Sequence, residues 1–437
     1  MFKTLMNAFK IKDLRNKILF TFAMIVVIRL GSQLPVPGVD RNYFAAWFAA
    51  QSGDAFNFLD AFTGGSFMNM SVFALNISPY ITSSIIMQLL TIAIPKLEEM
   101  QKDGEEGRKK IASITRYVTV GLALIESAAM AIGFGRSGLL QEYNAINVII
   151  VVAAMTAGSA VVMWIGERIT EHGVGNGISV VLAVNILSRL PQDMNGLYEQ
   201  FIKGKAIAVG VLAAVIILVI MLAMIIMVIV LNGGVRKIPV QYAKKMQGRK
   251  IVGGQSSNIP LRVNTAGVIP IIFASSIMET PNVICAIFGI NPSGVWAEIL
   301  KGMSSSNWCR LDAPLYSIGL VVYILMVIFF AYFYTSITFN PLEISENMKK
   351  QGGFVPGIRP GRPTCDYLNK ILNYIIFIGA CGLTIIGILP FVFNGLFGAS
   401  VSFGGTSLII IVSVILETVK QIESQMLVRN YTGFLND

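Results

Sequence analysis

Charged residues are scarce in this chain. Asp, Glu, Lys and Arg make up 13% of its 437 residues, whereas a soluble domain carries about a quarter. Histidine occurs once, as His172, which excludes a metal centre built from several histidines. The 4 cysteines show no C-x-x-C spacing and predict neither a zinc site nor a disulfide framework. No phosphate-binding loop and no nucleophile–base constellation is visible, so we expect no cofactor, no bound metal and no enzymatic activity.

The chain contains several long apolar runs. Hydrophobic residues make up 54% of the chain, and its mean hydropathy is +0.68. A helix needs about 20 apolar residues to cross the hydrocarbon core of a membrane. The strong candidates are Ile18–Leu34, Leu75–Ile94, Val118–Phe134, Ile146–Ile165, Ala206–Leu231, Ala266–Ile287, Leu315–Phe339 and Ile371–Phe393. Two shorter runs, Ile178–Leu190 and Ser407–Val419, are left undecided by periodicity alone.

The distribution of basic residues decides the number of spans. With both short runs included there are ten spans, and most of the 34 lysines and arginines lie in loops on the side of the basic N-terminus. Omitting Ile178–Leu190 moves the basic loops 232–262 and 340–370 to the opposite side, against the positive-inside rule. The sequence therefore predicts an all-α polytopic membrane protein with ten transmembrane helices and both ends in the cytoplasm.

Few ionisable groups fall inside these spans, and Glu126 is the clearest. Four others lie near span ends, where snorkelling to the membrane surface explains them: Arg29, Arg189, Glu279 and Glu417. A secondary transporter of small solutes remains an alternative, because transporters also contain broken spans and inverted halves. The scarcity of charge near the midplane speaks against it, since coupled transporters usually place acids or histidines there.

Two basic cytoplasmic loops are long enough to have a function of their own. In the first, KIPVQYAKKMQGRKIVGG is typical of two short strands around a turn near Gly248. In the second, the prolines of GFVPGIRPGRPT prevent a helix and its glycines sharpen the turns, so that Arg359 and Arg362 are held outward. A solvated connector is the simpler interpretation, and docking of RNA or an acidic protein surface is the alternative.

Two further features allow two interpretations each. Segment 54–70 is apolar but too short to span, so it lies on the outer membrane surface or re-enters the membrane. Gln88, Glu126 and Asn264 lie in or at the edge of three different spans. Ordinary hydrogen bonding between helices is the simpler interpretation of these polar side chains.

Four motifs together resemble the bacterial SecY family, the channel subunits of the Sec translocon. They are PYITSSIIMQLL, ERITEHGVGNGIS, NTAGVIPIIFASSI and GFVPGIRPGRPT, and they occur in the order of that family over nearly the whole chain. The resemblance implies two pseudo-symmetric halves of five helices, 1–190 and 206–437, around an hourglass pore with a short re-entrant plug helix. It implies a passive channel that passes unfolded secretory polypeptides across the membrane and releases transmembrane segments sideways into lipid.

The resemblance also assigns residues to parts of such a channel. The pore ring would consist of Ile81, Ile85, Ile186, Ile272 and Ile415. The plug, within segment 54–70, would include Phe58, Leu59, Phe62, Gly64 and Gly65. The lateral gate would include Gln88, Glu126 and Asn264. The cytoplasmic docking residues would be Arg249, Lys250, Arg359 and Arg362.

Partners and location follow from the same resemblance. It implies SecE and SecG as small partner subunits in the membrane. It implies the SecA ATPase or the ribosome at the cytoplasmic loops, with ribosomal RNA contacted by basic side chains. Signal peptides, nascent polypeptides and membrane lipids complete the expected partners. The bacterial character of the motifs places the chain in the plasma membrane as a multi-pass protein.

Overall fold

The computed structural model describes residues 8–432 except for 42, 45, 47–59, 61–62, 136–137, 139, 204–206, 243–244, 248–249, 253–255, 289–292, 311–313 and 398–404. Most of the described residues are helical. The helices are α2 (Lys12–Gly31), α5 (Ser78–Ala93), α6 (Pro95–Lys102), α7 (Glu105–Phe134), α8 (Ala145–His172), α9 (Gly177–Phe201), α10 (Ile207–Gly233), α11 (Ile269–Phe288), α12 (Val295–Met303), α13 (Ile318–Thr338), α14 (Pro341–Lys350), α15 (Arg362–Phe397) and α16 (Gly405–Thr432). Two 3-10 turns, η2 (Ser305–Asn307) and η3 (Pro314–Ser317), lie between α12 and α13.

Each predicted span coincides with a helix. In chain order these helices are α2, α5, α7, α8, α9, α10, α11, α13, α15 and α16. Within the described part of the chain, 5 helices are long and apolar enough to cross a membrane, and 6 if α5 and α6, which meet at 101°, form one bent span. The fold is that of a mostly helical polytopic membrane protein, and the count of ten crossings stays a prediction.

Several helices are longer than the apolar runs that predicted them. Helix α7 begins at Glu105, well before the predicted span Val118–Phe134, and the acidic residues in its first turn favour the positive end of the helix dipole. Helix α9 is capped by the side chain of Asn176 and continues through Pro191 to Phe201. Hydropathy marks only the apolar part of a helix, so the sequence underestimated both lengths.

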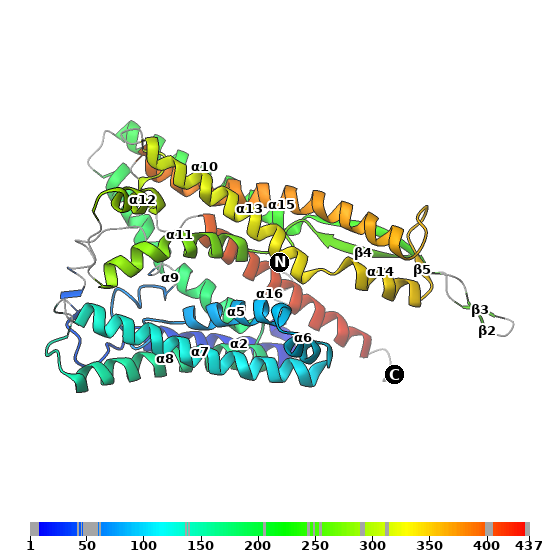
Figure 1. Cartoon of the computed structure of the whole chain (residues 1–437), viewed down its shortest axis with the longest axis horizontal. Helices are drawn as coiled ribbons and strands as arrows, with labels where there is room; N and C mark the ends of the chain where they lie inside the picture. The colour runs from blue at the N-terminus through cyan, green and yellow to red at the C-terminus, as the bar shows by residue number, and fades with distance from the viewer. Residues whose placement is uncertain are drawn as a thin grey trace.

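The helices pack in layers (Figure 1). Helices α2, α7 and α8 lie on one side, α10, α13 and α15 on the other, and α5, α9, α11 and α16 between them. Helix α5 packs against α7, α9 against α16, and α11 against α13. Small residues allow the closest approaches: a Cβ atom on Gly158 of α8 would lie 1.9 Å from the carbonyl oxygen of Val72.

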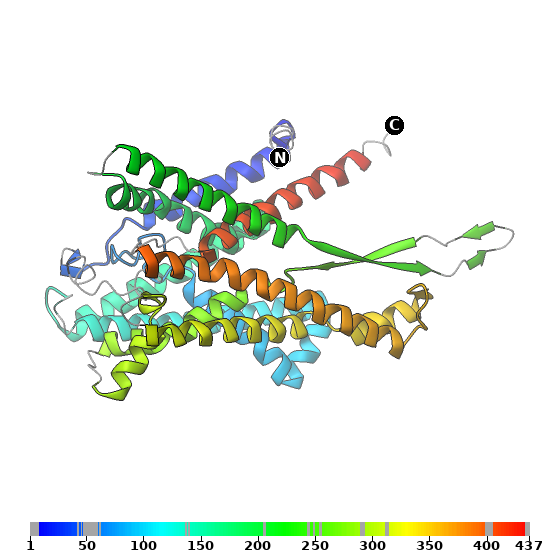
Figure 2. The ribbon, with the colours of Figure 1, turned by 90° about the horizontal axis from the view of Figure 1, so that it is seen from above.

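One end of the molecule carries a long β-hairpin (Figure 2). Strand β1 (Val235–Tyr242) pairs antiparallel with β4 (Ser256–Arg262), and β2 (Lys245–Gln247) pairs with β3 (Lys250–Val252) farther out. The predicted strands around a turn near Gly248 are confirmed, since Gln247 lies opposite Lys250. A third strand, β5 (Gly353–Phe354), pairs with the other edge of β1 and was not predicted.

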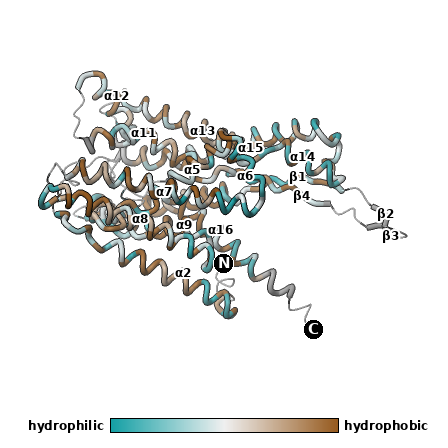
Figure 3. Tube along the Cα trace, turned by 60° about the horizontal axis from the view of Figure 1, so that its bottom comes forward, coloured by the Kyte–Doolittle hydropathy of each residue, from teal (hydrophilic) through white to brown (hydrophobic). Residues whose placement is uncertain are grey.

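Hydropathy varies along the long axis of the molecule (Figure 3). Hydrophobic residues predominate over the helix bundle, whereas hydrophilic residues gather at α6, α14 and the hairpin strands. Helix α2 begins and α16 ends on the hairpin side of the bundle (Figure 2). The ends of the described chain thus lie toward the hairpin, and the cytoplasmic location of both ends stays a prediction.

Candidate functional site

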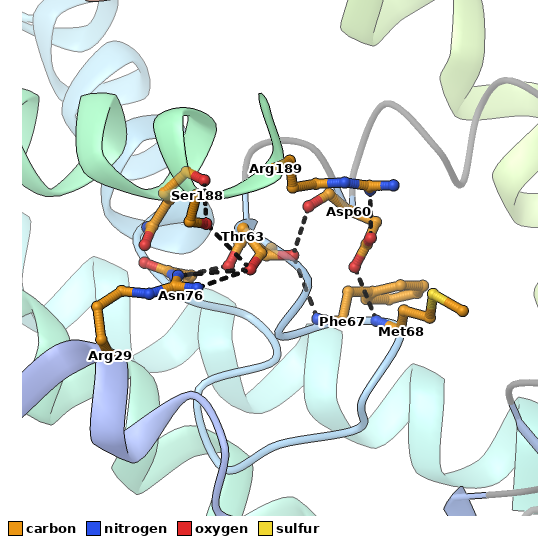
Figure 4. Close-up of polar contacts among 10 residues, drawn as sticks. Arg29, Asp60, Thr63, Phe67, Met68, Asn76, Ser188 and Arg189 are labelled. Atoms are coloured by element: carbon orange, nitrogen blue, oxygen red, sulfur yellow. Dashed lines mark hydrogen bonds and ion pairs between the residues drawn. The ribbon is translucent and has the colours of Figure 1, made fainter. Parts of the chain in front are cut away.

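The segment that follows residue 60 meets α9 toward the end of the bundle opposite the hairpin (Figure 1), and a buried ion pair joins the two (Figure 4). Asp60, whose side chain is 1% exposed, is paired with Arg189 of α9, whose side chain is 13% exposed. The other carboxylate oxygen of Asp60 accepts a hydrogen bond of 2.8 Å from the amide of Met68. The prediction that Arg189 snorkels to the membrane surface is wrong, because its guanidinium forms an ion pair with the buried carboxylate of Asp60. Hydropathy gives no signal for this ion pair, because its two residues are 129 positions apart in the chain.

The next turn of this segment is held through its backbone. The carbonyl of Gly64 accepts hydrogen bonds from Arg29 of α2 at 3.4 Å and from the Ser188 hydroxyl of α9, also at 3.4 Å. Arg29 is therefore also engaged inside the protein, contrary to the snorkelling prediction. Gly64 has a φ of +67°, and a Cβ atom there would lie 2.8 Å from the carbonyl oxygen of Asn185. Only glycine fits this position without displacing backbone.

Further hydrogen bonds tie the segment to the core. Asn76 donates to the carbonyl of Thr63 at 3.3 Å, and the carbonyl of Asn76 accepts from Ser159 of α8 at 3.0 Å. The Thr63 hydroxyl donates to the Asp60 carbonyl and accepts from the Phe67 amide, both at 3.2 Å. Residues 60 and 63–70 thus contact α2 and α9 directly and are tied to α8 through Asn76, which fixes the segment in the bundle rather than on its surface.

The predicted plug residues fall partly on this segment. Gly64 and Gly65 form its positive-φ turn, with φ values of +67° and +84°. Phe58, Leu59 and Phe62 lie outside the described residues. The residues that sequence reasoning missed are those that hold the turn, above all Asp60 and Arg189.

An apolar cluster lies where α5, α9, α11 and α16 converge. Its buried members are Leu182 and Ile186 of α9 and Ile410 and Ile411 of α16, and the partly buried members packed on them include Ile81 of α5 and Ile272 of α11. Ile186 is 2% exposed. Three of the five predicted ring isoleucines, Ile81, Ile186 and Ile272, therefore lie together in one cluster.

The other two predicted ring residues lie elsewhere. Ile415 is 46% exposed and is not a member of the cluster, where Ile411 of the same helix takes part instead. The two positions are four residues, about one helical turn, apart in α16. Ile85 lies one turn along α5 and lines a narrow pocket with Phe273 and Phe330, whose rings stack 5.1 Å apart.

The three predicted gate residues occupy separate places. Asn264 donates to the side-chain oxygen of Asn232 at 2.8 Å, and Asn232 donates to the Ser413 hydroxyl of α16 at 2.7 Å. Gln88 is exposed and lines the aromatic pocket between α5, α11 and α13. Glu126 is half-buried on α7. The hydrogen bond of Asn264 thus connects the segment before α11 to α10, and Asn232 continues the connection to α16.

At the hairpin end, a loop presents two arginines to solvent. Arg359 and Arg362 are both exposed, while the Thr364 hydroxyl donates to the Arg359 carbonyl at 2.8 Å. Val355 is buried and Ile358 packs on the same core cluster, so the loop is fixed from beneath. Arg249 lies outside the described residues, and Lys250 begins strand β3. Within the described ranges, no group of three or more His, Cys, Asp and Glu side chains could hold a metal ion.

Comparisons with known proteins agree on one family. The SecY family model matches residues 71–419. The protein translocase subunit SecY of Corynebacterium glutamicum is 44% identical over 455 residues, which cover 99% of both chains.

Two solved structures have a similar fold at low sequence identity. A SecY structure described for a plug domain that stabilises the closed translocation channel aligns with a TM-score of 0.61 at 16% identity, covering 94% of this chain and 92% of that one. Sec61 in the canine ribosome–channel complex aligns with a TM-score of 0.60 at 16% identity and the same coverage. These likenesses show the fold, and the full-length relative and the family model show that the chain belongs to the SecY family of protein translocase subunits.

Proposed function

We propose that the chain forms the protein-conducting channel of a bacterial Sec translocon, with its pore at the apolar cluster. The observation that supports this most directly is the convergence of aliphatic side chains from α5, α9, α11 and α16. A ring of such side chains resists the passage of water and ions because it offers them no polar partner. It also offers no group to which a passing polypeptide would bind tightly. The ring proposed here consists of Ile81, Leu182, Ile186, Ile272 and Ile411.

The segment around Gly64 acts as the plug on the outer side of this ring. Its ion pair and its backbone hydrogen bonds to α2 and α9 would hold it in the closed position. Removing one partner of a buried pair costs about 3–5 kcal/mol, because the other charge is left buried and unpaired, so loss of either residue would favour release of this segment. The name plug is used for residues 54–70 from here on.

The lateral gate lies between α5 and α7 of one half, 1–190, and α11 and α13 of the other, 206–437. The aromatic pocket lined by Ile85, Gln88, Phe273 and Phe330 supports an apolar seam at this place. A hydrophobic signal peptide that binds the open state more tightly than the closed one would part the two halves. Ten spans, with both chain ends in the cytoplasm of a plasma membrane, complete this arrangement.

The basic hairpin end receives the driving partner. Arg359 and Arg362 are exposed, and a planar guanidinium can bind a phosphate or a carboxylate through two hydrogen bonds. Either carboxylates of the SecA ATPase or phosphates of ribosomal RNA would bind these arginines in this way. SecE and SecG would cover part of the exposed apolar surface within the membrane. The chain itself is a pore and catalyses no reaction.

Crosslinking from a stalled secretory polypeptide tests the proposed pore. Single cysteines at Ile186 and Ile272 probe the cluster, Ile415 probes the alternative register, and Val219, exposed on α10, is the lipid-side control. We expect adducts at Ile186 and Ile272 and none at Val219. An engaged polypeptide that contacts Ile415 but neither of the other two isoleucines would contradict the proposed ring.

A further inference from the structure

Helix α12 stands out from the bundle at the end opposite the hairpin (Figures 1 and 3). It follows α11, precedes α13 and contacts both helices. With 9 residues it is too short to cross a membrane. Neither the proposed pore nor the proposed docking loop uses it.

One side of α12 is apolar and exposed. Trp296 is 71% exposed, and Val295 and Ile299 beside it are exposed as well. Leu315 of η3 and Ile318 at the start of α13 are also exposed. We call these five side chains the α12 patch. Clustered exposed apolar residues of this kind mark a surface that binds lipid or another protein.

Polar contacts fix this patch rigidly to the bundle. Glu279 of α11 accepts a hydrogen bond of 2.8 Å from the Ser305 hydroxyl, just after α12. Glu279 is 7% exposed, so the prediction that it snorkels is wrong. Trp308 is buried, packs 5.4 Å from the ring of Tyr323 on α13, and donates to the carbonyl of Gly302 at 2.8 Å.

The other side of α12 carries paired charges. The Tyr316 hydroxyl and the Lys301 ammonium both donate to Glu298, at 2.5 and 3.0 Å. Both bonds lower the pKa of Glu298, the tyrosine having the larger effect, so this carboxylate is ionised at neutral pH. The helix therefore has an apolar side and a charged side, as helices in the plane of a membrane surface do.

The position of the patch identifies its partner. Helix α13 is a candidate membrane span, and its exposed side chains Val321, Val322 and Leu325 are lipid-facing in a membrane protein. The α12 patch continues this apolar surface past Ile318 to the end of the span. Tryptophan is enriched at this depth, where its ring is half in the apolar and half in the polar layer.

We propose that α12 lies in the membrane–water interface on the side opposite the hairpin and anchors the adjoining ends of α11 and α13 to the lipid surface. Its Trp296 side enters the boundary between head groups and acyl chains, while Glu298 and Lys301 face water. One consequence rests on the proposed function: α11 and α13 form one side of the lateral gate, so the anchor would hold that side in place while the other moves. The anchor itself requires only that the chain spans the membrane.

Depth measurements on spin labels test this proposal. In a cysteine-free background of the full chain, Val295→Cys and Ile299→Cys carry a nitroxide in proteoliposomes. Lys301→Cys is the matched control on the charged side of the same helix, and Leu325→Cys is the lipid reference on α13. We expect the labels at 295 and 299 to lie about 5–10 Å inside the headgroup boundary. The label at 301 is expected in water, more accessible to a water-soluble nickel reagent than to oxygen.

Two outcomes would overturn the proposal. Labels at 295 and 299 that are as accessible to the nickel reagent as the label at 301 would place the patch in water. Labels inaccessible to both reagents would mean that a second copy or another protein covers it. A measurement on the unmodified chain guards against misfolded variants: a phospholipid with a photoreactive acyl chain should label Val295, Trp296 or Ile299 and leave Lys301 unlabelled.

Discussion

The two ends of the molecule hold arginine in opposite ways. Arg189 is nearly buried, and its guanidinium forms an ion pair with Asp60 inside the protein. Arg359 is exposed, and its backbone carbonyl accepts a hydrogen bond from the Thr364 hydroxyl. At the first end side chains hold a segment in place. At the second end the backbone and two apolar side chains hold the segment, which leaves the charge available to a partner.

The two arginines therefore have different expected roles: Arg189 stabilises a buried segment, whereas Arg359 is available to bind a partner. A buried charge contributes to the structure only while its partner is present, because an unpaired charge in an apolar interior is costly. A charge at the surface contributes about 0–1 kcal/mol to stability, so its removal affects binding instead. Substitutions at the two ends should therefore divide into those that loosen the closed structure and those that leave it intact.

The largest effect is expected from Arg189→Ala. It leaves the Asp60 carboxylate buried without its cation, and we expect the plug to lose about 3–5 kcal/mol of local stability. A single cysteine introduced by Ser66→Cys, at a side chain 1% exposed, reports opening through its rate of labelling by a maleimide. The rate should rise by about two to four powers of ten when opening is in equilibrium.

The matched control removes an arginine from the other end. Arg359→Ala should leave the labelling rate of the Ser66→Cys probe unchanged, because Arg359 is exposed in the loop at the hairpin end. Proteoliposomes provide a second measurement, since a displaced plug should raise the leak of ions through the resting protein. An Arg189→Ala variant with unchanged labelling would show that the ion pair does not hold the segment.

A smaller effect is expected from Gly64→Ala. The added Cβ atom would lie 2.8 Å from the Asn185 carbonyl oxygen and 2.9 Å from a guanidinium nitrogen of Arg29. Left-handed backbone costs alanine about 1–2 kcal/mol, and the clash with backbone adds to that cost. Gly65→Ala is the matched control, because it has φ +84° but no atom closer than 4.0 Å. The difference in unfolding free energy between the two variants measures the approach to α9, and equal losses would exclude that approach.

The two ends also differ in how much of them the sequence could predict. The hairpin end is encoded locally: alternating residues around Gly248 predict the strands, and the prolines of residues 353–364 predict an exposed loop. The ion pair of Asp60 and Arg189 joins residues 129 apart, and neither residue has a local pattern that indicates a partner. Strand β5 has 2 residues, too few for any alternation to be visible.

The proposed pore ring shows, within one helix, the same limit on what the sequence can predict. The isoleucines of α16 follow each other closely, and hydropathy is nearly equal for Ile410, Ile411 and Ile415. Which of them points to α9 depends on the rotation of α16 about its axis, and packing against distant helices sets that rotation. The sequence therefore predicts that this helix contributes to the ring, and whether Ile411 or Ile415 does so stays a prediction that the crosslinking experiment tests.

A third test concerns the backbone scaffold at the hairpin end. A Cβ atom on Gly353 of β5 would lie 2.8 Å from the Tyr242 ring and 2.9 Å from the Met348 side chain. Because these are the ends of side chains that can shift, Gly353→Ala should cost only about 1–2 kcal/mol. Hydrogen exchange at the amides of β1 and β5 measures the loss, which should be confined to this end. Faster exchange in residues 63–70 would contradict the independence of the two ends.

The smallest effect on stability is expected from Arg359→Glu, although its effect on function should be large. An exposed side chain without a structural contact changes the free energy of unfolding by no more than about 0.5 kcal/mol, so the thermal midpoint and membrane abundance should stay as they are. Secretion driven by SecA should fall, because the substitution turns an attractive charge into a repulsive one at a fixed position. Lys370→Glu, which reverses an exposed charge farther along α15, is the matched control and should secrete normally. Normal secretion by Arg359→Glu would mean that the loop only connects two helices; loss of secretion together with loss of abundance would mean that the exposed arginine is structural after all, and the contrast with Arg189 would fail.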